Sequence, residues 1–190
     1  GINRRKYTKR LLVELIKNGS YRNILDIGSG VQNWSHLFSK DTNYHTVDLR
    51  SDVGASHIGD FFTIHFDQKY DLIIATELVE HLPNTSEFFK RSGDLLAENG
   101  VLLISFPFFF KIHPDPSDFY RFTLQGIKEK SKSYFDIIRH VYHGNKIQLI
   151  WETLVDGKHF YPLKALNYII ARFDYKNQFY TRFNEVNNKR

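Results

Sequence analysis

The sequence predicts an α/β fold in which helices cover both faces of a mostly parallel sheet. Four short apolar runs are typical of buried parallel strands, at residues 24–27, 43–49, 70–75 and 101–106. Segments with apolar residues at helical spacing alternate with these runs, and two glycines directly follow the first run. Because such alternation is characteristic of parallel sheets with helices on both sides, we expect one layered α/β domain.

The first predicted element is a helix over residues 3–18. Its apolar residues lie on one stripe at helical spacing: Tyr7, Leu11, Leu12, Leu15 and Ile16. Gly19 is a suitable helix stop. After the first strand we expect a helix at 32–39, and after the second strand a short strand at 61–64. A helix at 85–97 precedes the most hydrophobic strand of the chain.

The last third of the chain departs from this alternation. It predicts a helix at 124–133 and a strand at 135–143. Apolar residues at three-and-four spacing then predict two helices, at 147–155 and 161–173. A final strand at 179–186 is expected to be antiparallel, at the edge of the sheet. The segment 144–176 is thus a predicted helical insertion on the acceptor side of the domain.

Composition is consistent with one globular domain over residues 1–190, with 42% apolar and 25% charged residues. The chain has no cysteine, which excludes a disulfide framework, a thiol nucleophile and a cysteine-ligated metal. No run of about 18 apolar residues predicts a membrane span. We therefore expect a cytoplasmic protein. The net charge of +5 includes no basic run long enough for a dedicated nucleic-acid arm.

The segment that organises the chain is residues 23–30, a strand that ends in Gly28 and Gly30. Glycines at this place allow a tight turn and leave no side chain between the backbone and a ligand. A helix over residues 31–39 would direct its amide N-terminus to the same place. A strand, a bare turn and a helix start together predict a site for a nucleotide-like ligand.

Acidic residues define that ligand further. Asp48 ends the second strand about 20 residues after the first, where it can accept hydrogen bonds from ribose hydroxyls. Asn33 replaces the third glycine of the dinucleotide fingerprint, and Asp26 would face a pyrophosphate unfavourably. A carboxylate there suits a ligand with a positive charge, such as the sulfonium of S-adenosylmethionine.

At these positions the chain resembles the class I S-adenosylmethionine-dependent methyltransferases. The matching segments follow one another in the family's order, at residues 25–30, 47–49, 59–61, 70–75, 80–83 and 95–102. The resemblance implies a Rossmann-like three-layer αβα sandwich, whose mostly parallel seven-stranded sheet has an antiparallel last strand. It also implies S-adenosylmethionine as the cofactor and S-adenosylhomocysteine as its product.

The same resemblance assigns residues to parts of the cofactor. Gly28 and Gly30 would lie against its methionine part. The remaining implied cofactor-binding residues are Asp26 near the amino acid, Asp48 on the ribose, Leu49, Asp60 and Phe61 at the adenine, and Thr76 and Glu77 at the border with the acceptor. Gln32 stands where the family often has a third glycine.

A second informative segment, residues 113–123, follows the strand that ends at Pro107. It resembles a loop of bacterial methyltransferases that are encoded with surface-glycan and nucleotide-sugar enzymes. On this basis Asp118, Tyr120 and Arg121 are predicted to bind the substrate. The alternative is a tight loop in which Asp118 pairs with Arg121 and Thr123 caps the next helix.

Two histidines are candidates for a catalytic base, because a hydroxyl acceptor benefits from a group with a pKa near neutrality. His81 is four residues after Glu77, so both share a face if this segment is helical. His113 is the second candidate. No metal site is predicted, because the histidines and carboxylates show no recognised ligand spacing.

The leading hypothesis is O-methylation of a small-molecule acceptor, a sugar or glycan precursor. An RNA methyltransferase is the second hypothesis, favoured by the positive charge but not by any motif for a flipped base. The third is a non-catalytic relative that binds the cofactor or serves as a partner subunit. The acceptor is the only expected partner, and the oligomeric state is left open.

Overall fold

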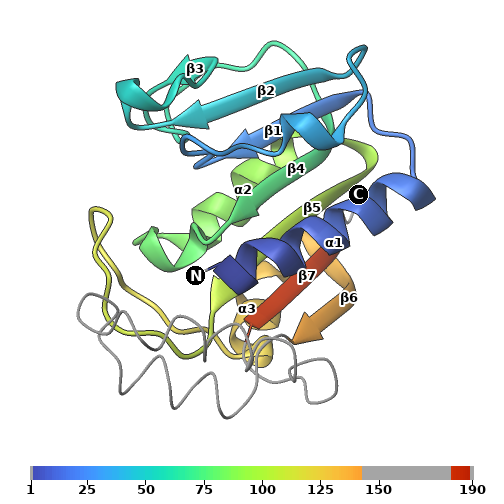
Figure 1. Ribbon diagram of the computed structural model, residues 1–190. Coiled ribbons are helices and arrows are strands. Elements are labelled where there is room, and N and C mark those ends of the chain that lie inside the picture. Colours follow the sequence, from blue (N-terminus) through green and yellow to red (C-terminus); the bar gives the residue numbers. More distant parts are fainter. Residues whose placement is uncertain (1, 143–180, 189–190) are drawn as a thin grey trace, which may run out of the picture.

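The structure, a computed structural model, describes residues 2–142 and 181–188, which form one sheet with helices on both faces (Figure 1). The strands are β1 Asn23–Ile27, β2 Asn43–Asp48, β3 His57–Ile58, β4 Tyr70–Thr76, β5 Leu96–Pro107, β6 Phe135–Tyr142 and β7 Thr181–Asn188. Their order across the sheet is β3-β2-β1-β4-β5-β7-β6. Only β7 runs antiparallel to its neighbours, so the predicted fold class is confirmed.

Strand β7 lies between β5 and β6 rather than at the edge, so that part of the prediction is wrong. It pairs with β5 from Val101 to Pro107 and with β6 along its other side. The outermost strand is β6, whose outward residue Ile138 is 57% exposed. Strand β7 pairs with β5 along Val101–Pro107, where β5 is buried and its backbone groups need hydrogen-bond partners.

Within the described residues, three α-helices cover the sheet: α1 Ile2–Asn18, α2 Thr85–Leu95 and α3 Leu124–Ser131. Figure 1 shows α1 across one face, with α2 and α3 behind the sheet. Two separate apolar clusters reflect these layers. Leu12 and Leu15 of α1 pack with Ile24 in one cluster, and Phe88 and Phe89 of α2 belong to the other.

The helix predicted at 32–39 is wrong, because only the short 3₁₀ turn Ser35–Leu37 forms there. Backbone groups of this segment are used elsewhere. The Trp34 amide donates to the Tyr44 hydroxyl (3.1 Å), and Arg5 donates to the backbone carbonyls of Gln32 and Asn33. The Arg5 guanidinium also lies 4.0 Å from the centre of the buried Trp34 ring. Side chains from α1 and β2 thus hold an irregular loop in place of a helix.

The short strand predicted at 61–64 is also wrong. The structure has a turn there, in which the amides of Thr63 and Ile64 donate to the Asp60 carbonyl (both 3.0 Å). The third strand lies just before it, where His57–Ile58 pairs with the end of β2. Apolar residues occur in the turn because Phe61 is buried in the core.

The predicted helical insertion at 144–176, with its helices at 147–155 and 161–173, lies outside the described residues. Among the helices that are described, none combines the length and apolar character needed to cross a membrane.

Candidate functional site

A cavity of about 280 Å³ opens at the carboxyl ends of β1, β2 and β4. This is where open parallel sheets bind their ligands. Most of the predicted site residues line it: Gly28, Gly30, Asp48, Leu49, Asp60, Phe61, Glu77 and His81. The cavity therefore brings together residues that are about 50 positions apart in the sequence.

The glycine turn forms one wall of the cavity. Gly28 has φ +65° and Gly30 has φ +56°, in the left-handed region that disfavours side chains. The Gly28 amide donates to the Val47 carbonyl (2.8 Å), which ties the turn to the end of β2. A Cβ atom at Gly28 would lie 2.9 Å from Leu78 Cδ1. The turn thus presents bare backbone to the cavity, as predicted from the two glycines.

Asp48 lies at the end of β2 and links the turn to its neighbours. Its Oδ2 accepts from the Gly30 amide (2.9 Å), and its Oδ1 accepts from the Arg50 amide (3.0 Å). The side chain is 10% exposed and lines the cavity. Each carboxylate oxygen can accept a second hydrogen bond, so Asp48 can hold vicinal hydroxyls while it supports the turn.

A more apolar end of the cavity lies beside β2 and the turn at 60–64. Phe61 is buried, whereas Leu49 is 63% exposed at the rim. The Asp60 Oδ1 atom accepts from the Phe62 amide (2.9 Å), which fixes the carboxylate at the cavity wall. Apolar side chains next to a fixed carboxylate suit a planar ring that carries an amino group.

Asp26 and Thr76, two of the predicted cofactor contacts, do not line the cavity. Asp26 is buried behind the turn, where the Tyr44 hydroxyl donates to its Oδ2 atom (2.6 Å). Burial raises the pKa of Asp26 to about 7, although this hydrogen bond opposes the shift. Asp26 thus contacts Tyr44 and the backbone of the loop that follows the glycine turn, and its approach to the ligand stays a prediction.

Glu77 begins the chain segment after β4 with an unusual backbone, at φ +53°. Its amide donates to the Ser105 carbonyl (2.8 Å) and to the Ser105 hydroxyl (3.1 Å). That hydroxyl in turn donates to Glu77 Oε1 (3.1 Å). These bonds to β5 hold a strained residue whose side chain reaches the cavity, a type of strain that is concentrated at functional sites.

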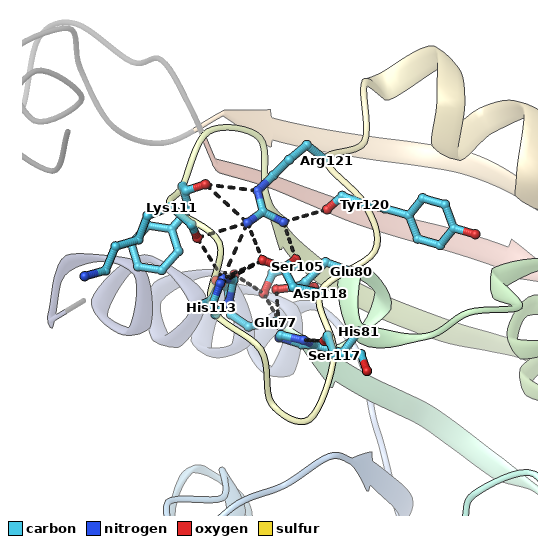
Figure 2. A network of polar contacts seen from close by, with 11 residues as sticks. Glu77, Glu80, His81, Ser105, Lys111, His113, Ser117, Asp118, Tyr120 and Arg121 are labelled. Atoms are coloured by element: carbon cyan, nitrogen blue, oxygen red, sulfur yellow. Dashed lines mark hydrogen bonds and ion pairs between the residues drawn. The ribbon is translucent and has the colours of Figure 1, made fainter.

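The two histidine candidates lie close together, within one network of polar contacts (Figure 2). His81 lines it from the 3₁₀ turn Val79–His81, and its Nδ1 donates to the Ser117 carbonyl. The His113 ring stands edge-on to the His81 ring, with centroids 4.9 Å apart, but it does not line the cavity. Partial burial lowers the pKa of His113, so its neutral form is favoured.

The predicted substrate-binding residues hold the loop together instead of lining the cavity. The Asp118 side chain is 2% exposed and accepts two hydrogen bonds from the Arg121 guanidinium (2.5 and 2.6 Å). Arg121 also donates to the Phe110 carbonyl (3.2 Å), and the Tyr120 hydroxyl donates to the Pro83 carbonyl (2.9 Å). The alternative stated for this segment, a tight loop with an internal ion pair, is the arrangement that forms.

Thr123 caps α3 as that alternative expects, since its hydroxyl accepts from the Gly126 amide (3.0 Å).

Other residues that line the cavity were not predicted. They are Ile27, Val47, Arg50, Gly59, Phe62, Leu78, Leu82, Asp115 and Pro116. Asp115 and Pro116 lie in the loop at 113–123. The position of this loop after β5 could have indicated that they reach the cavity. Leu78 and Leu82 are ordinary apolar residues without a local signal.

Replacing Asp118 by asparagine is expected to lower the free energy of unfolding at neutral pH by about 2–4 kcal/mol, because it removes the buried carboxylate that pairs with the Arg121 guanidinium. The Arg121 hydrogen bonds hold the pKa of Asp118 well below its usual range. The stabilisation is therefore complete above about pH 4, the pKa in unfolded chains, and is lost as the pH falls below it.

Urea unfolding of both proteins at pH 7 and pH 3 measures this difference. Glu129→Gln is the matched control, since it removes an exposed ion pair with Lys132 and should cost less than about 1 kcal/mol. The free energies of unfolding of Asp118→Asn and the parent are compared at each pH. A difference as large at pH 3 as at pH 7 would mean that the charge of Asp118 is not the source of the stabilisation.

The strand order, the bare turn after β1 and the acid at the end of β2 together define a class I methyltransferase fold. A family model described as "Methyltransferase domain" matches residues 2–178. The chain belongs to this family, which confirms the resemblance found in the sequence.

Solved structures agree in fold. The N-methyltransferase NodS from Bradyrhizobium japonicum WM9, in complex with S-adenosylhomocysteine, has a TM-score of 0.63 at 13% identity, over 98% of this chain and 87% of that one. A SAM-dependent methyltransferase from Archaeoglobus fulgidus has a TM-score of 0.64 at 15% identity, over 97% and 94%. Haemonchus contortus phosphoethanolamine N-methyltransferase 2 with S-adenosylmethionine has a TM-score of 0.58 at 15% identity, over 89% and 49%. No curated protein matches the sequence.

Proposed function

We propose that this protein transfers a methyl group from S-adenosylmethionine to a hydroxyl group of a small molecule, a sugar or glycan precursor. The observation that carries the proposal is one cavity lined both by the glycine turn with Asp48 and by His81. It thus offers a place for a nucleoside donor next to a group that can take a proton. Structural neighbours crystallised with S-adenosylmethionine or S-adenosylhomocysteine support the choice of donor.

We propose one orientation of the donor in the cavity. The backbone at Gly28 and Gly30 would lie against the methionine part, and Asp48 would accept from the ribose hydroxyls. Asp60 would accept from the adenine amino group, with Leu49 and Phe61 beside the ring. Asp26 would lie near the amino acid end of the donor. Thr76, at the end of β4, would act by placing Glu77 at the border between donor and acceptor.

Methyl transfer is an in-line displacement, in which the acceptor oxygen attacks the methyl carbon and the sulfur leaves with the electron pair of the broken bond. The hydroxyl proton must go to a base. Because the Nδ1–H of His81 donates to the Ser117 carbonyl, its Nε2 carries the lone pair that can accept this proton. Asp118 and Arg121 would contribute by holding the loop that carries Ser117 and His113.

An amine acceptor is the second candidate, because the carboxylates of Glu77 and Asp115 also line the cavity and suit a cationic substrate. Two of the structural neighbours are N-methyltransferases by name. We favour a hydroxyl acceptor because of the base at His81. The cytoplasm is the proposed compartment, with which the absence of cysteine is compatible.

Transfer of labelled methyl from S-adenosylmethionine tests the proposal, with nucleotide sugars, free sugars, small amines and RNA as separate acceptor pools. Label is expected in a sugar pool and to resist treatments that cleave methyl esters. Label in the amine pool alone would establish the second candidate, and label in RNA alone would contradict both. A protein that binds the donor but labels no pool, including a total cell extract, would be a non-catalytic relative.

Replacing Gly28 by alanine is expected to lower the affinity for S-adenosylhomocysteine at least tenfold. The new Cβ would displace Leu78 at the cavity wall, and the left-handed backbone would cost about 1 kcal/mol. Gly54→Ala is the matched control: Gly54 has φ +71°, and a Cβ there meets no atom within 4 Å. Both variants should lose similar stability in thermal unfolding, but only Gly28→Ala should lose affinity in calorimetry. Equal affinities of the two variants for S-adenosylhomocysteine would mean that the turn does not belong to the binding site.

A further inference from the structure

We infer that Glu80, His81 and His113 form a binding site for one divalent transition-metal ion at the acceptor end of the cavity. Binding of the ion is independent of the proposed function, whereas its role in methyl transfer rests on that function. The sequence does not predict the site, because the two histidines are 32 positions apart and come together only when the loop folds back on η3, Val79–His81.

The three side chains already lie close enough to share an ion. One ligand atom from each lies within 4.8 Å of the others. Glu80 Oε1 and His81 Nε2 are 3.7 Å apart. Ligands about 2.1 Å from a tetrahedral zinc ion are separated by roughly 3.4 Å, so small side-chain movements would complete the site.

Each ring is held as a metal-ligating histidine usually is. The His81 Nδ1–H donates to the Ser117 carbonyl, and the His113 Nδ1–H donates to the Lys111 carbonyl (3.1 Å). Such bonds fix the tautomer and leave Nε2 of each ring to bind an ion. Asp118 Oδ2 lies 3.2 Å from the same His113 Nδ1 and accepts from the His113 amide (2.9 Å), which fixes the residue further.

The charges around the site suit a cation. Arg121 is the nearby guanidinium, and the carboxylates of Asp118, Glu80 and Glu77 all raise its pKa. Three carboxylates around one guanidinium leave excess negative charge in a place where Glu80 is completely buried. An ion with two positive charges would offset this excess.

The ligand set indicates the class of ion. Two imidazoles and one carboxylate suit Zn²⁺, Co²⁺ or Fe²⁺, whereas Mg²⁺ and Ca²⁺ prefer sites made only of oxygen atoms. Three protein ligands leave a position for water, as in catalytic zinc sites. Hydroxide formed from this water would take the hydroxyl proton of the acceptor and become water again, in place of His81. His81 would then act as a ligand rather than as the base.

Titration of untagged, metal-free protein with Co²⁺, followed by its visible absorption, tests the site without donor or acceptor. One ion per chain is expected. His113→Gln and Glu80→Gln should each weaken binding at least tenfold, and the double variant His81→Gln/His113→Gln should abolish it. His65→Gln is the matched control and should bind normally, since His65 and Asp67 form an exposed surface pair (3.0 Å).

Absence of binding to the parent protein, or equal binding to the double variant, would overturn the proposal. So would an equal loss in His65→Gln, which would indicate a surface ion. His113→Gln changes a partly exposed side chain and keeps the test valid if the double variant does not fold. Calorimetry with S-adenosylhomocysteine on the metal-free protein reports the proposed function separately. A chelator that stops methyl transfer without lowering this affinity would assign the ion to the reaction.

Discussion

Replacing Asp48 by alanine is expected to weaken the binding of S-adenosylhomocysteine about 100-fold. Two hydrogen bonds from ribose hydroxyls to a carboxylate contribute about 1.5–3 kcal/mol each when the group is partly buried. The Asp48 side chain is 10% exposed, so water competes weakly for it. The substitution also removes the acceptor of the Gly30 amide, which loosens the turn against which the methionine part would lie.

Two further variants separate these effects in calorimetry. Asp48→Asn keeps an oxygen that can accept from the Gly30 amide, and we expect an intermediate loss of about tenfold. Asp52→Ala is the matched control, because Asp52 lies in the neighbouring turn Ser51–Val53 but does not line the cavity. It should bind as the parent does. An Asp48→Ala protein with parental affinity would mean that the ribose lies elsewhere.

Replacing His81 by asparagine is expected to lower kcat by a factor of 10² to 10⁴, the range typical of general acid–base catalysis. Asparagine can still donate its side-chain N–H to the Ser117 carbonyl, so the loop keeps this contact. It lacks the Nε2 lone pair, which either accepts the proton or binds the inferred ion. The affinity for S-adenosylhomocysteine should change less than threefold, because the donor would lie against the glycine turn.

The acceptor pool identified by methyl labelling provides the assay for this variant. His65→Asn serves as the control and should keep parental turnover, since His65 is an exposed surface residue. Partial recovery of turnover in the His81→Ala protein by free imidazole would indicate the base role. Recovery of turnover by excess Zn²⁺ is not expected, whether His81 acts as the base or as a ligand. Unchanged turnover in His81→Asn would exclude His81 from both roles.

The sequence predicted the parallel core of the sheet because its signal is local. Apolar runs such as Leu72 to Ala75 are buried on both faces, and the structure places them where the pattern indicates. The place of the cavity, at the carboxyl ends of the strands, could be predicted for the same reason. Strand ends meet at one edge of a parallel sheet, so Asp48 and Gly28 had to lie close together once both strands were recognised.

Features that depend on contacts between distant segments could not be predicted in this way. Trp34 and Phe38 have helical spacing, but an arginine from α1 and a tyrosine from β2 bind the backbone there, and no helix forms. The hydrogen bond of Asp26 is another such contact, because its partner Tyr44 is 18 positions away.

The loop at 113–123 illustrates the same limit for function. Its polar residues indicated a site, yet the structure uses Asp118 and Arg121 to brace the loop, while Asp115 and Pro116 reach the cavity. The pairing of His81 with His113 follows from this bracing. A pattern of residues locates a functional loop, but internal hydrogen bonds decide which of its side chains remain available to a ligand.

The central claim is that the cavity at the glycine turn binds an S-adenosyl nucleoside. Isothermal titration of the parent protein with S-adenosylhomocysteine tests it most directly, in parallel with adenosine and NAD. We expect one site per chain, with a dissociation constant in the micromolar range and at least tenfold weaker binding of the other two ligands. Absence of heat at millimolar S-adenosylhomocysteine, or tighter binding of NAD, would contradict the account.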